Sequence, residues 1–410
     1  IDVTVKKKFN IKVDIAEEKD YNTKLTQKLE IIPKNIARLY KIIEITEKKR
    51  SILLFTNTRE TAEALASQLK TLKTRFNIGV HHGSLSKEER LKMEKEFKKG
   101  KIKLLICTSS LELGIDIGSV DYVIQYTSPR QTTNLIQRIG RAGHRLGEIS
   151  KGIILATNGD DIIEAAVITK NAKTHNLEKL EIHENALDIL AHQLVGLLLD
   201  KHTIRVEEAE KIIKRAYPYR NITREMIRET AAFLAEIGII RYEVEYNEIL
   251  KKRRGKTWKY YYENLSVIPD TRRYNVISIE NMKPIGNLDE EFIALHIGKE
   301  TPFILSGTTW KPIKIDEEEG RIYVQYSPNE LGAIPTWIGE LIPVPYIIAQ
   351  EAGRLREKIT KEENIKNRYP LTEKALNEAK KELEEHISSG IQLPTDKRII
   401  IEGLGKIIII

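Results

Sequence analysis

Short apolar runs alternate with amphipathic helical stretches over the first part of the chain. The runs have the length of strands, and the stretches between them carry apolar side chains three or four residues apart, which is helical spacing. Strands are predicted at 1–20, 51–55, 79–82, 103–107, 121–125 and 152–155, and helices at 34–48, 59–70, 87–99 and from residue 132 onward. This alternation predicts a parallel α/β sheet with helices on its faces. Ligands of such sheets bind at the carboxyl ends of the strands.

The pattern changes near residue 170. Three helical stretches at 184–201, 206–216 and 223–237 precede an alternating run at 239–246. Three helices followed by a short hairpin predict a winged helix. A plain helical linker domain is the alternative interpretation.

The last part of the chain is first β-rich and then helical. Short strands punctuated by Gly, Pro and Asn occupy 251–345 and predict a small barrel or sandwich. Residues 346–389 are helical, and two strands of an unfinished sheet are predicted after them, so both chain ends are expected to be cuts. The predicted domains are 1–170, 171–250 and 251–410, the last truncated at its C-terminus.

Composition narrows the class of protein. A chain of 410 residues exceeds one ordinary core and predicts two to four domains. Charged residues make up 31% of it with both signs interspersed, a pattern typical of the ion-pair networks on heat-adapted surfaces. The formal net charge of +8 permits a polyanionic partner without requiring one.

Cysteine and histidine usage bears on location and metals. The single cysteine, Cys107, lies in an apolar run and is predicted to be a buried thiol, so no disulfide framework is possible and a cytoplasmic location is expected. The nine histidines show no zinc spacing with cysteine, so no metal site is predicted. No apolar run approaches the roughly 20 residues of a membrane span, and no membrane partner is expected.

Polar side chains follow the buried strand at 51–55. Asn57, Thr58 and Arg59 stand where this strand turns into a helix. Short polar side chains and the free amides of a helix N-terminus suit contact with phosphate. Helix capping explains the same residues equally well.

A second polar segment, TSSLELGIDIG, covers residues 108–118 and follows the strand at 103–107. The hydroxyls of Thr108 and Ser109 are placed to touch a nucleic-acid phosphate. Gly114 permits close approach of the backbone, and Asp116 can accept from a ribose hydroxyl or hold an arginine. An ordinary loop is the alternative, which the full spacing of the segment disfavours.

The third segment is QRIGRAGHR over 137–145. Gln137, Arg138, Arg141 and Arg145 fall within two helical turns and mostly share a face. Clustered arginines repel one another unless an anion lies among them, and a phosphoryl group with developing charge indicates an arginine finger. A solvated basic helix is the alternative, but the glycines argue against it.

The three segments resemble motifs IV, V and VI of superfamily-two helicases in the same order. With HHGSLSKEER at 81–90 they resemble one branch closely, the Lhr family of large helicase-related proteins, in particular its archaeal members. YPYRNIT, NLSVIPD, IGNLDEEF, SGTTW and PTWIGE are similar to segments of the winged helix and β-barrel of that family. The resemblance covers nearly the whole chain. It implies a second RecA-like domain followed by a winged helix and a β-barrel plus helical domain.

The resemblance also implies roles for single residues. Asn57, Thr58 and Thr108 would contact the phosphates of the tracking strand, with Arg59 and Ser109 beside them. Gly114 and Asp116 would lie near the ATP ribose, while Gln137, Arg138 and Arg141 would face the nucleotide as catalytic residues. Arg141 is the best candidate for an arginine finger, and it also counts as an ATP-binding residue.

One position departs from other relatives. DEAD-box helicases carry a further arginine where His144 stands in this chain. The sequence leaves open whether a second finger exists or whether Arg145 supplies it.

Only half of a motor is present in the sequence. It has no phosphate-binding loop of the form G-x-x-x-x-G-K-[ST] and no acidic DExH box for Mg²⁺. Gly255-Lys256-Thr257 mimics the end of such a loop, but it lacks the upstream glycine and lies in a strand-like context. ATP and Mg²⁺ would therefore bind together with a missing N-terminal RecA-like domain, and the 410-residue chain alone is expected to be inactive as an ATPase.

Cations and aromatic rings are interleaved after residue 250. Lys252, Arg253 and Arg254 belong to a run of six cations in nine residues that contains Trp258 and ends in three tyrosines. Proteins bind single-stranded nucleic acid with cationic side chains that contact the phosphates and aromatic rings that stack on the bases. A charged hairpin with its aromatics packed inward is the alternative. Trp310 is the second predicted stacking residue, on the strength of the family resemblance, although a tryptophan in a β domain is usually core.

The leading prediction is the C-terminal part of an ATP-dependent helicase that moves 3′→5′ on one strand and acts in DNA repair or recombination. Its expected partners are single-stranded or forked DNA, or an RNA–DNA hybrid. A non-motor nucleic-acid-binding scaffold and an RNA helicase of another superfamily-two branch are the alternatives. A scaffold without motor action would have no need of Arg141. The RNA helicase stays open as an alternative because contacts to the nucleic-acid backbone tolerate either DNA or RNA.

Overall fold

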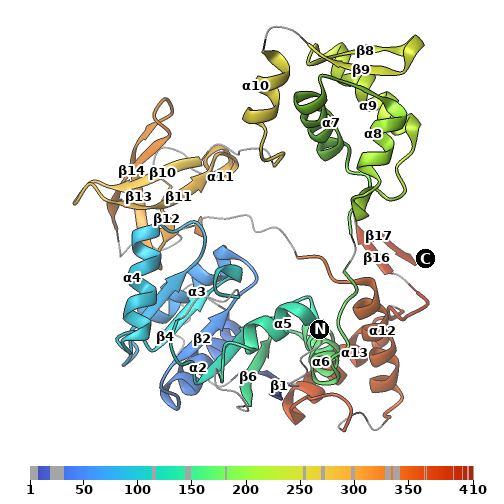
Figure 1. The fold of residues 1–410 in the computed structure, drawn as a ribbon. Helices are drawn as coiled ribbons and strands as arrows, with labels where there is room; N and C mark the ends of the chain where they lie inside the picture. The colour runs from blue at the N-terminus through green and yellow to red at the C-terminus, as the bar shows by residue number, and fades with distance from the viewer. Residues whose placement is uncertain are drawn as a thin grey trace. The chain divides into compact units, whose positions relative to one another are not determined.

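The computed structural model describes most of the chain as two compact units (Figure 1). The described residues are 8–18, 32–112, 117–143, 149–180, 182–252, 255–268, 273–296, 301–327, 334–335, 342–363, 365, 367–390, 392–398, 400–403 and 406–409. Unit one comprises Ile1–Glu178 and Arg272–Ile410, and unit two comprises Lys179–Thr271. These limits differ from the predicted domains, chiefly because the chain returns to unit one after leaving it.

Unit one is built on a six-stranded parallel sheet with strand order β1-β6-β5-β2-β4-β3. Its strands are β1 Phe9–Ile15, β2 Ile52–Phe55, β3 Ile78–His81, β4 Leu104–Cys107, β5 Tyr122–Tyr126 and β6 Ser150–Ala156. Its helices are α2 Pro33–Glu47, α3 Arg59–Thr71, α4 Lys87–Lys98, α5 Thr132–Ile139 and α6 Gly159–Thr174, with a 3₁₀ turn η1 at Ser109–Leu111. β2 and β4 are buried on both faces, which is why they read as unbroken apolar runs. Cys107 is buried at the end of β4, as predicted.

Helices begin at the carboxyl ends of these strands with a capping side chain. Thr58 accepts from the Thr61 amide (3.1 Å) and begins α3. Ser86 accepts from the Glu89 amide (3.2 Å) and begins α4, which confirms the predicted cap. The polar turns therefore gather along one edge of the sheet.

A second, curled sheet in unit one has the order β11-β10-β14-β13-β12-β15. Its elements are β10 Arg273–Ser278, β11 Pro284–Asp289, α11 Glu290–His296, β12 Phe303–Leu305, β13 Thr308–Asp316, β14 Arg321–Tyr326 and β15 Ile334–Pro335. The predicted β-rich region is thus confirmed for the described residues between Arg273 and Pro335, which are mostly strands. Val276, Leu288 and Phe303 of this sheet share one buried cluster with Leu65 and Leu85 of the parallel-sheet domain.

The curled sheet is joined to the loop after β3 by backbone pairing. The Ser86 amide donates to Ile285 O (3.1 Å), and the Asn287 amide donates to Ser84 O (2.8 Å). Between them lies Gly286, where a Cβ atom would stand 2.6 Å from Ser84 O. Only glycine permits this approach.

A buried hydrogen bond between two side chains supports the same junction. His82 Nε2 lies 2.7 Å from Glu63 Oε1, and both side chains are fully buried. The Glu63 carboxylate also accepts from the amides of Ser306 (2.6 Å) and Gly307. Lys70 donates to the carbonyls of the same two residues at 3.2 and 3.1 Å. One carboxylate on α3 thus holds the β12–β13 turn.

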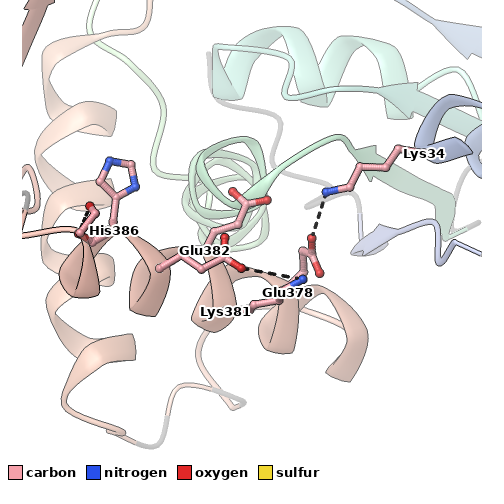
Figure 2. Close-up of a pocket in the computed structure, with 7 residues that line it drawn as sticks. Lys34, Glu378, Lys381, Glu382 and His386 are labelled. Carbon is pink, nitrogen blue, oxygen red and sulfur yellow. Dashed lines mark hydrogen bonds and ion pairs between the residues drawn. The ribbon is translucent and has the colours of Figure 1, made fainter. Parts of the chain in front are cut away.

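Two C-terminal helices, α12 Tyr346–Thr360 and α13 Glu373–Ser388, pack on α6 rather than on the curled sheet. Glu382 accepts from the Gly159 amide (2.6 Å), and Arg356 pairs with Asp160 (2.8 Å). Figure 2 shows Glu382 on α13, with Lys34 of α2 extending toward Glu378; that ion pair measures 3.7 Å. α6 is buried nearly all round and needs cover on two sides, which explains this packing. The two predicted terminal strands occur as β16 Ile400–Gly403 and β17 Lys406–Ile409.

Unit two contains the predicted winged helix. Its elements are α7 Leu187–Lys201, β7 Thr203–Arg205, α8 Val206–Ile213, η2 Tyr217–Tyr219, α9 Arg224–Glu236, β8 Ile240–Glu243, η3 Val244–Tyr246 and β9 Glu248–Lys251. The strands form a small sheet in the order β7-β9-β8. β8 and β9 make the wing. In the described part of the whole chain, no helix is long and apolar enough to cross a membrane.

One prediction in unit two is wrong. The run from Gly255 onward was expected to be strand-like, but Lys256–Glu263 forms helix α10. Gly255 directly precedes the helix with a φ of 75°, in the left-handed region that glycine adopts at little cost. The buried Thr257 hydroxyl donates to Ile239 O (2.8 Å) and accepts from the Lys252 amide (3.2 Å), which fixes the first turn of the helix.

Replacing Glu63 with alanine tests the junction between the two sheets of unit one. The change leaves His82 and two amides without their buried acceptor, at a cost of about 3–5 kcal/mol. We expect the thermal unfolding midpoint to fall by roughly 10 °C in calorimetry. Glu88→Gln, an exposed glutamate in the first turn of α4, is the control. Equal midpoints for the two variants would contradict the role given to Glu63.

Candidate nucleotide and nucleic-acid site

The carboxyl edge of the parallel sheet gathers side chains from the three segments singled out by sequence and from strand β5. Asn57 follows β2, Glu112 follows η1 after β4, and Gln125 lies near the end of β5. Arg138 of α5 reaches all three. This edge is where an open parallel sheet binds its ligands.

Arg138 is the centre of this arrangement. Its Nε donates to Glu112 Oε1 (2.7 Å), and one terminal nitrogen donates to Asn57 Oδ1 (2.8 Å) and Gln125 Oε1 (2.9 Å). The guanidinium carbon lies 5.8 Å from the centre of the Phe55 ring. The residue is 1% exposed. A planar guanidinium can serve three acceptors at once, which an ammonium group cannot do with the same geometry.

The burial of Arg138 bears on its predicted role. A side chain buried among Glu112, Asn57 and Gln125 does not face a cleft. The geometry instead favours a positioning role, in which Arg138 fixes the strand ends relative to α5. Its predicted catalytic role stays a prediction.

The loop between β5 and α5 is held from two sides. Asn57 Nδ2 donates to Ser128 O (2.7 Å) and to Thr127 Oγ1 (3.2 Å). Asp161 of α6 accepts from the amides of Ser128 (2.6 Å) and Thr157 (2.9 Å). Burial raises the pKa of Asp161, and these amide hydrogen bonds act against the rise.

Glu178, the last residue of unit one before the chain leaves it, caps α5. Its carboxylate accepts from the amide of Thr132, from the amide of Thr133 (3.1 Å) and from the Thr133 hydroxyl (2.9 Å). Burial acts to raise the pKa of Glu178, but the hydrogen bonds from Thr132 and Thr133 outweigh it and lower the pKa. A negative charge at a helix N-terminus is also favoured by the helix dipole.

Arg141 lies on the rim beyond α5 and is half-buried. One terminal nitrogen donates to Glu112 O (2.7 Å). Its Nε is buried without a hydrogen-bond partner among the residues described. Burial lowers the pKa of the guanidinium. Gln137, four residues earlier, is exposed.

The side chains predicted to bind phosphate differ in solvent exposure and in whether they are already hydrogen-bonded. Ser109 is exposed, whereas Thr108 is buried, with its amide donating to His81 O (3.4 Å). Thr58 caps α3, so the capping interpretation holds for its hydroxyl. Arg59 begins α3 and is half-buried.

Several predicted residues cannot be placed. Gly114, Asp116, Arg253 and Arg254 lie outside the described residues, as do His144, Arg145 and Trp337. Their roles stay predictions.

The predicted stacking residues fall in different units. Trp258 on α10 of unit two is exposed, and Lys252 beside β9 is half-buried. Trp310 on β13 of unit one is half-buried, and its indole nitrogen donates to Leu305 O (2.9 Å). Its ring meets Tyr326 edge-on at 5.8 Å. Trp310 is therefore partly a packing residue.

Sequence reasoning missed four residues that build this site: Glu112, Gln125, Asp161 and Glu178. Two of these residues, Gln125 and Glu112, could have been recognised from their sequence context. Gln125 is a lone amide in the apolar strand Tyr122–Tyr126, and Glu112 is an acid between two leucines. Buried polar side chains need partners, so both positions pointed to a partner such as Arg138.

Comparison with protein families agrees with this geometry. Residues 34–146 match the family described as helicase conserved C-terminal domain. Residues 170–334 match the family described as large helicase-related protein, winged helix domain.

Two curated relatives align with most of the chain. The ATP-dependent helicase Lhr-Core of Methanocaldococcus jannaschii is 36% identical over 99% of this chain and 47% of its own length. The ATP-dependent helicase Lhr-Core of Sulfolobus acidocaldarius is 32% identical over 90% of this chain and 44% of its own length. The chain thus spans about half the length of the curated relatives it matches.

Solved structures share the fold. The structure of Mycobacterium smegmatis helicase Lhr bound to ssDNA and AMP-PNP matches with a TM-score of 0.62 and 24% identity, over 94% of this chain and 47% of that one. The structure of the DUF1998 helicase MrfA bound to DNA and AMPPNP matches with a TM-score of 0.55 and 18% identity, over 78% and 42%. The predicted fold class is confirmed.

Replacing Arg138 with lysine tests the buried network. One ammonium group leaves buried acceptors unpaired, at a cost of roughly 2–5 kcal/mol. We expect a clearly lower thermal unfolding midpoint. Arg50→Lys is the matched control, because Arg50 pairs with Asp121 (3.1 Å) while its side chain stays 90% exposed. If Arg138→Lys unfolds at the parent midpoint, the network does not organise this edge of the sheet.

Proposed function

Because this chain belongs to the Lhr-type family of large helicase-related proteins, we propose that it supplies the arginine finger and the strand grip of an ATP-dependent helicase. The chain spans about half the length of its curated relatives. The ATP-dependent helicase activity is therefore proposed for this chain together with a first RecA-like domain. Arg141 carries the proposal. It is a half-buried arginine whose Nε has no hydrogen-bond partner among the described residues.

A half-buried guanidinium with an unpartnered nitrogen, such as that of Arg141, is suited to stabilise a developing negative charge. The Glu112 carbonyl holds one end of Arg141, so little conformational freedom remains to be lost when an anion arrives. The unpartnered Nε offers a hydrogen bond that no described residue takes. We propose that Arg141 contacts the γ-phosphoryl group of ATP, with Gln137 beside it and Gly114 and Asp116 near the ribose.

The rest of the nucleotide site is proposed to come from a first RecA-like domain. The sequence holds no phosphate-binding loop, and no group of three or more candidate ligands in the described residues could hold a metal ion. Mg²⁺, held by that other domain, would neutralise charge on the phosphates. The 410-residue chain alone should therefore not turn over ATP.

Nucleic acid is proposed to run along the same edge of the sheet. Ser109 is exposed there beside the buried Thr108, and Asn57, Thr58 and Arg59 are half-buried. Backbone contacts of this kind position a strand without reading its bases. We propose single-stranded or forked DNA, or an RNA–DNA hybrid, as the substrate, with movement 3′→5′ and a role in DNA repair.

Replacing Arg141 with alanine tests the proposal in the chain joined to an Lhr-type first RecA-like domain. An arginine finger acts only in the transition state, so kcat and kcat/KM for nucleic-acid-dependent ATP hydrolysis should fall together by about 10³. Arg75→Ala, an exposed arginine after α3, should leave both unchanged.

Two outcomes would contradict the proposal. Full ATPase activity of the Arg141→Ala protein would show that Arg141 is not the arginine finger. ATP turnover above background by the 410-residue chain alone would show that the nucleotide site is complete without a first domain.

A further inference from the structure

The winged-helix unit has two surfaces of opposite character, and the first is formed by α9. This helix occupies the position of the recognition helix, which in many winged-helix and helix-turn-helix proteins enters a groove of DNA. Besides Arg224 and Ala232, its exposed residues are Glu225, Glu229, Phe233 and Glu236, and the exposed Ile237 follows directly after it. The exposed surface of α9 is therefore mainly acidic and apolar.

The arginines of α9 are already neutralised. Arg224 donates to Glu210 (2.7 Å), which also binds Lys214 (2.7 Å). These hydrogen bonds lower the pKa of Glu210 to about 2, so the pairs stay ionised at neutral pH. Arg228 contacts Glu225 (3.4 Å) and donates to Asn247 in the wing (3.2 Å).

The wing continues the acidic surface. Val244 and Tyr246 at its tip are 71% and 67% exposed, with the exposed Glu245 between them. Glu229, Glu236 and Glu245 form no ion pair with any residue in the described part of the chain. Three unpaired carboxylates would repel a phosphate backbone that came close to them.

The second surface is that of α10 and has the opposite charge. Lys256 and Lys259 are exposed on it, and Lys252 precedes it. Among the described residues, these lysines form one ion pair, Lys259–Glu263, at 3.8 Å and largely exposed. Such an exposed pair exchanges readily with solvent or with a phosphate.

Two aromatic rings lie among these lysines. Trp258 and Tyr262 are 56% and 49% exposed, one helical turn apart, with ring centres 4.3 Å apart. Tyr262 meets Tyr261 edge-on at 5.3 Å, and Tyr261 stacks on the buried His192 at 4.4 Å. His192 Nε2 also lies 3.1 Å from Tyr261 O. The outer rings are therefore backed by a ladder anchored in the core of the unit, which lowers the entropy lost when a base stacks on them.

We propose that single-stranded nucleic acid binds the winged-helix unit on the α10 surface, while α9 and the wing stay clear of it. A base stacks on the Trp258–Tyr262 pair, and Lys252, Lys256 and Lys259 contact the flanking phosphates. This assignment rests on the proposed function and deepens it. It identifies which surface of the winged helix holds the strand.

The test uses the 410-residue chain and a fluorescein-labelled oligothymidylate of about 20 nucleotides, followed by fluorescence anisotropy. Trp258→Ala should raise Kd about tenfold, and Trp258→Phe should restore most of the affinity because a ring remains. Lys256→Gln should reduce the slope of log Kd against log salt concentration by about 0.7. Phe233→Ala and Glu229→Gln, matched changes on α9, should leave Kd at the parent value. All four positions are exposed, and circular dichroism verifies that each variant is folded.

The outcomes separate the assignment from the proposed function. Weaker binding by Phe233→Ala with unchanged binding by Trp258→Ala would overturn the assignment alone, because the strand would then lie on α9. Absence of binding by the parent chain would overturn the proposed function and the assignment with it.

Discussion

The buried guanidinium of Arg138 is the interaction on which the edge of the parallel sheet depends. It joins side chains from the ends of β2 and β5 and from the turn after β4, and it does so without contact with water. An ion pair buried this deeply adds little net stability compared with apolar packing, but it admits only one arrangement of its partners. Loops that would otherwise move independently are thereby fixed together, and the position of Arg141 is fixed with them, because Glu112 holds both arginines.

Carboxylates that are buried, as in Glu63, or half-buried serve as the other joints of unit one. Glu63 attaches the curled sheet, Asp161 and Glu178 hold the two ends of the segment leading into α5, and Glu382 attaches the C-terminal helices to α6. In each case the carboxylate accepts from backbone amides at a turn or a helix start. Amide donors depend on the path of the backbone and not on side-chain identity, so such joints specify how segments meet.

The sequence predicted the parallel sheet well because β2 and β4 are apolar throughout. The capping residues Thr58 and Ser86 also mark where helices begin after β2 and β3. Helix α10 was missed because its lysines and tyrosines suit a strand equally well, and the deciding contact, Thr257 with Ile239, comes from outside the helix. The packing of α13 on α6 was missed for a related reason. Glu382 and Gly159 are 223 positions apart, and no local pattern reports such a pairing.

The cap that Glu178 places on α5 has a mechanical consequence. Glu178 ends unit one, and the next residues carry the chain covalently into the winged helix. Its carboxylate accepts from the amides of Thr132 and Thr133, so the first turn of the helix that bears Arg138 and the covalent link to unit two share one residue. A displacement of Glu178 along the chain would have to break these hydrogen bonds or move the first turn of α5 with it.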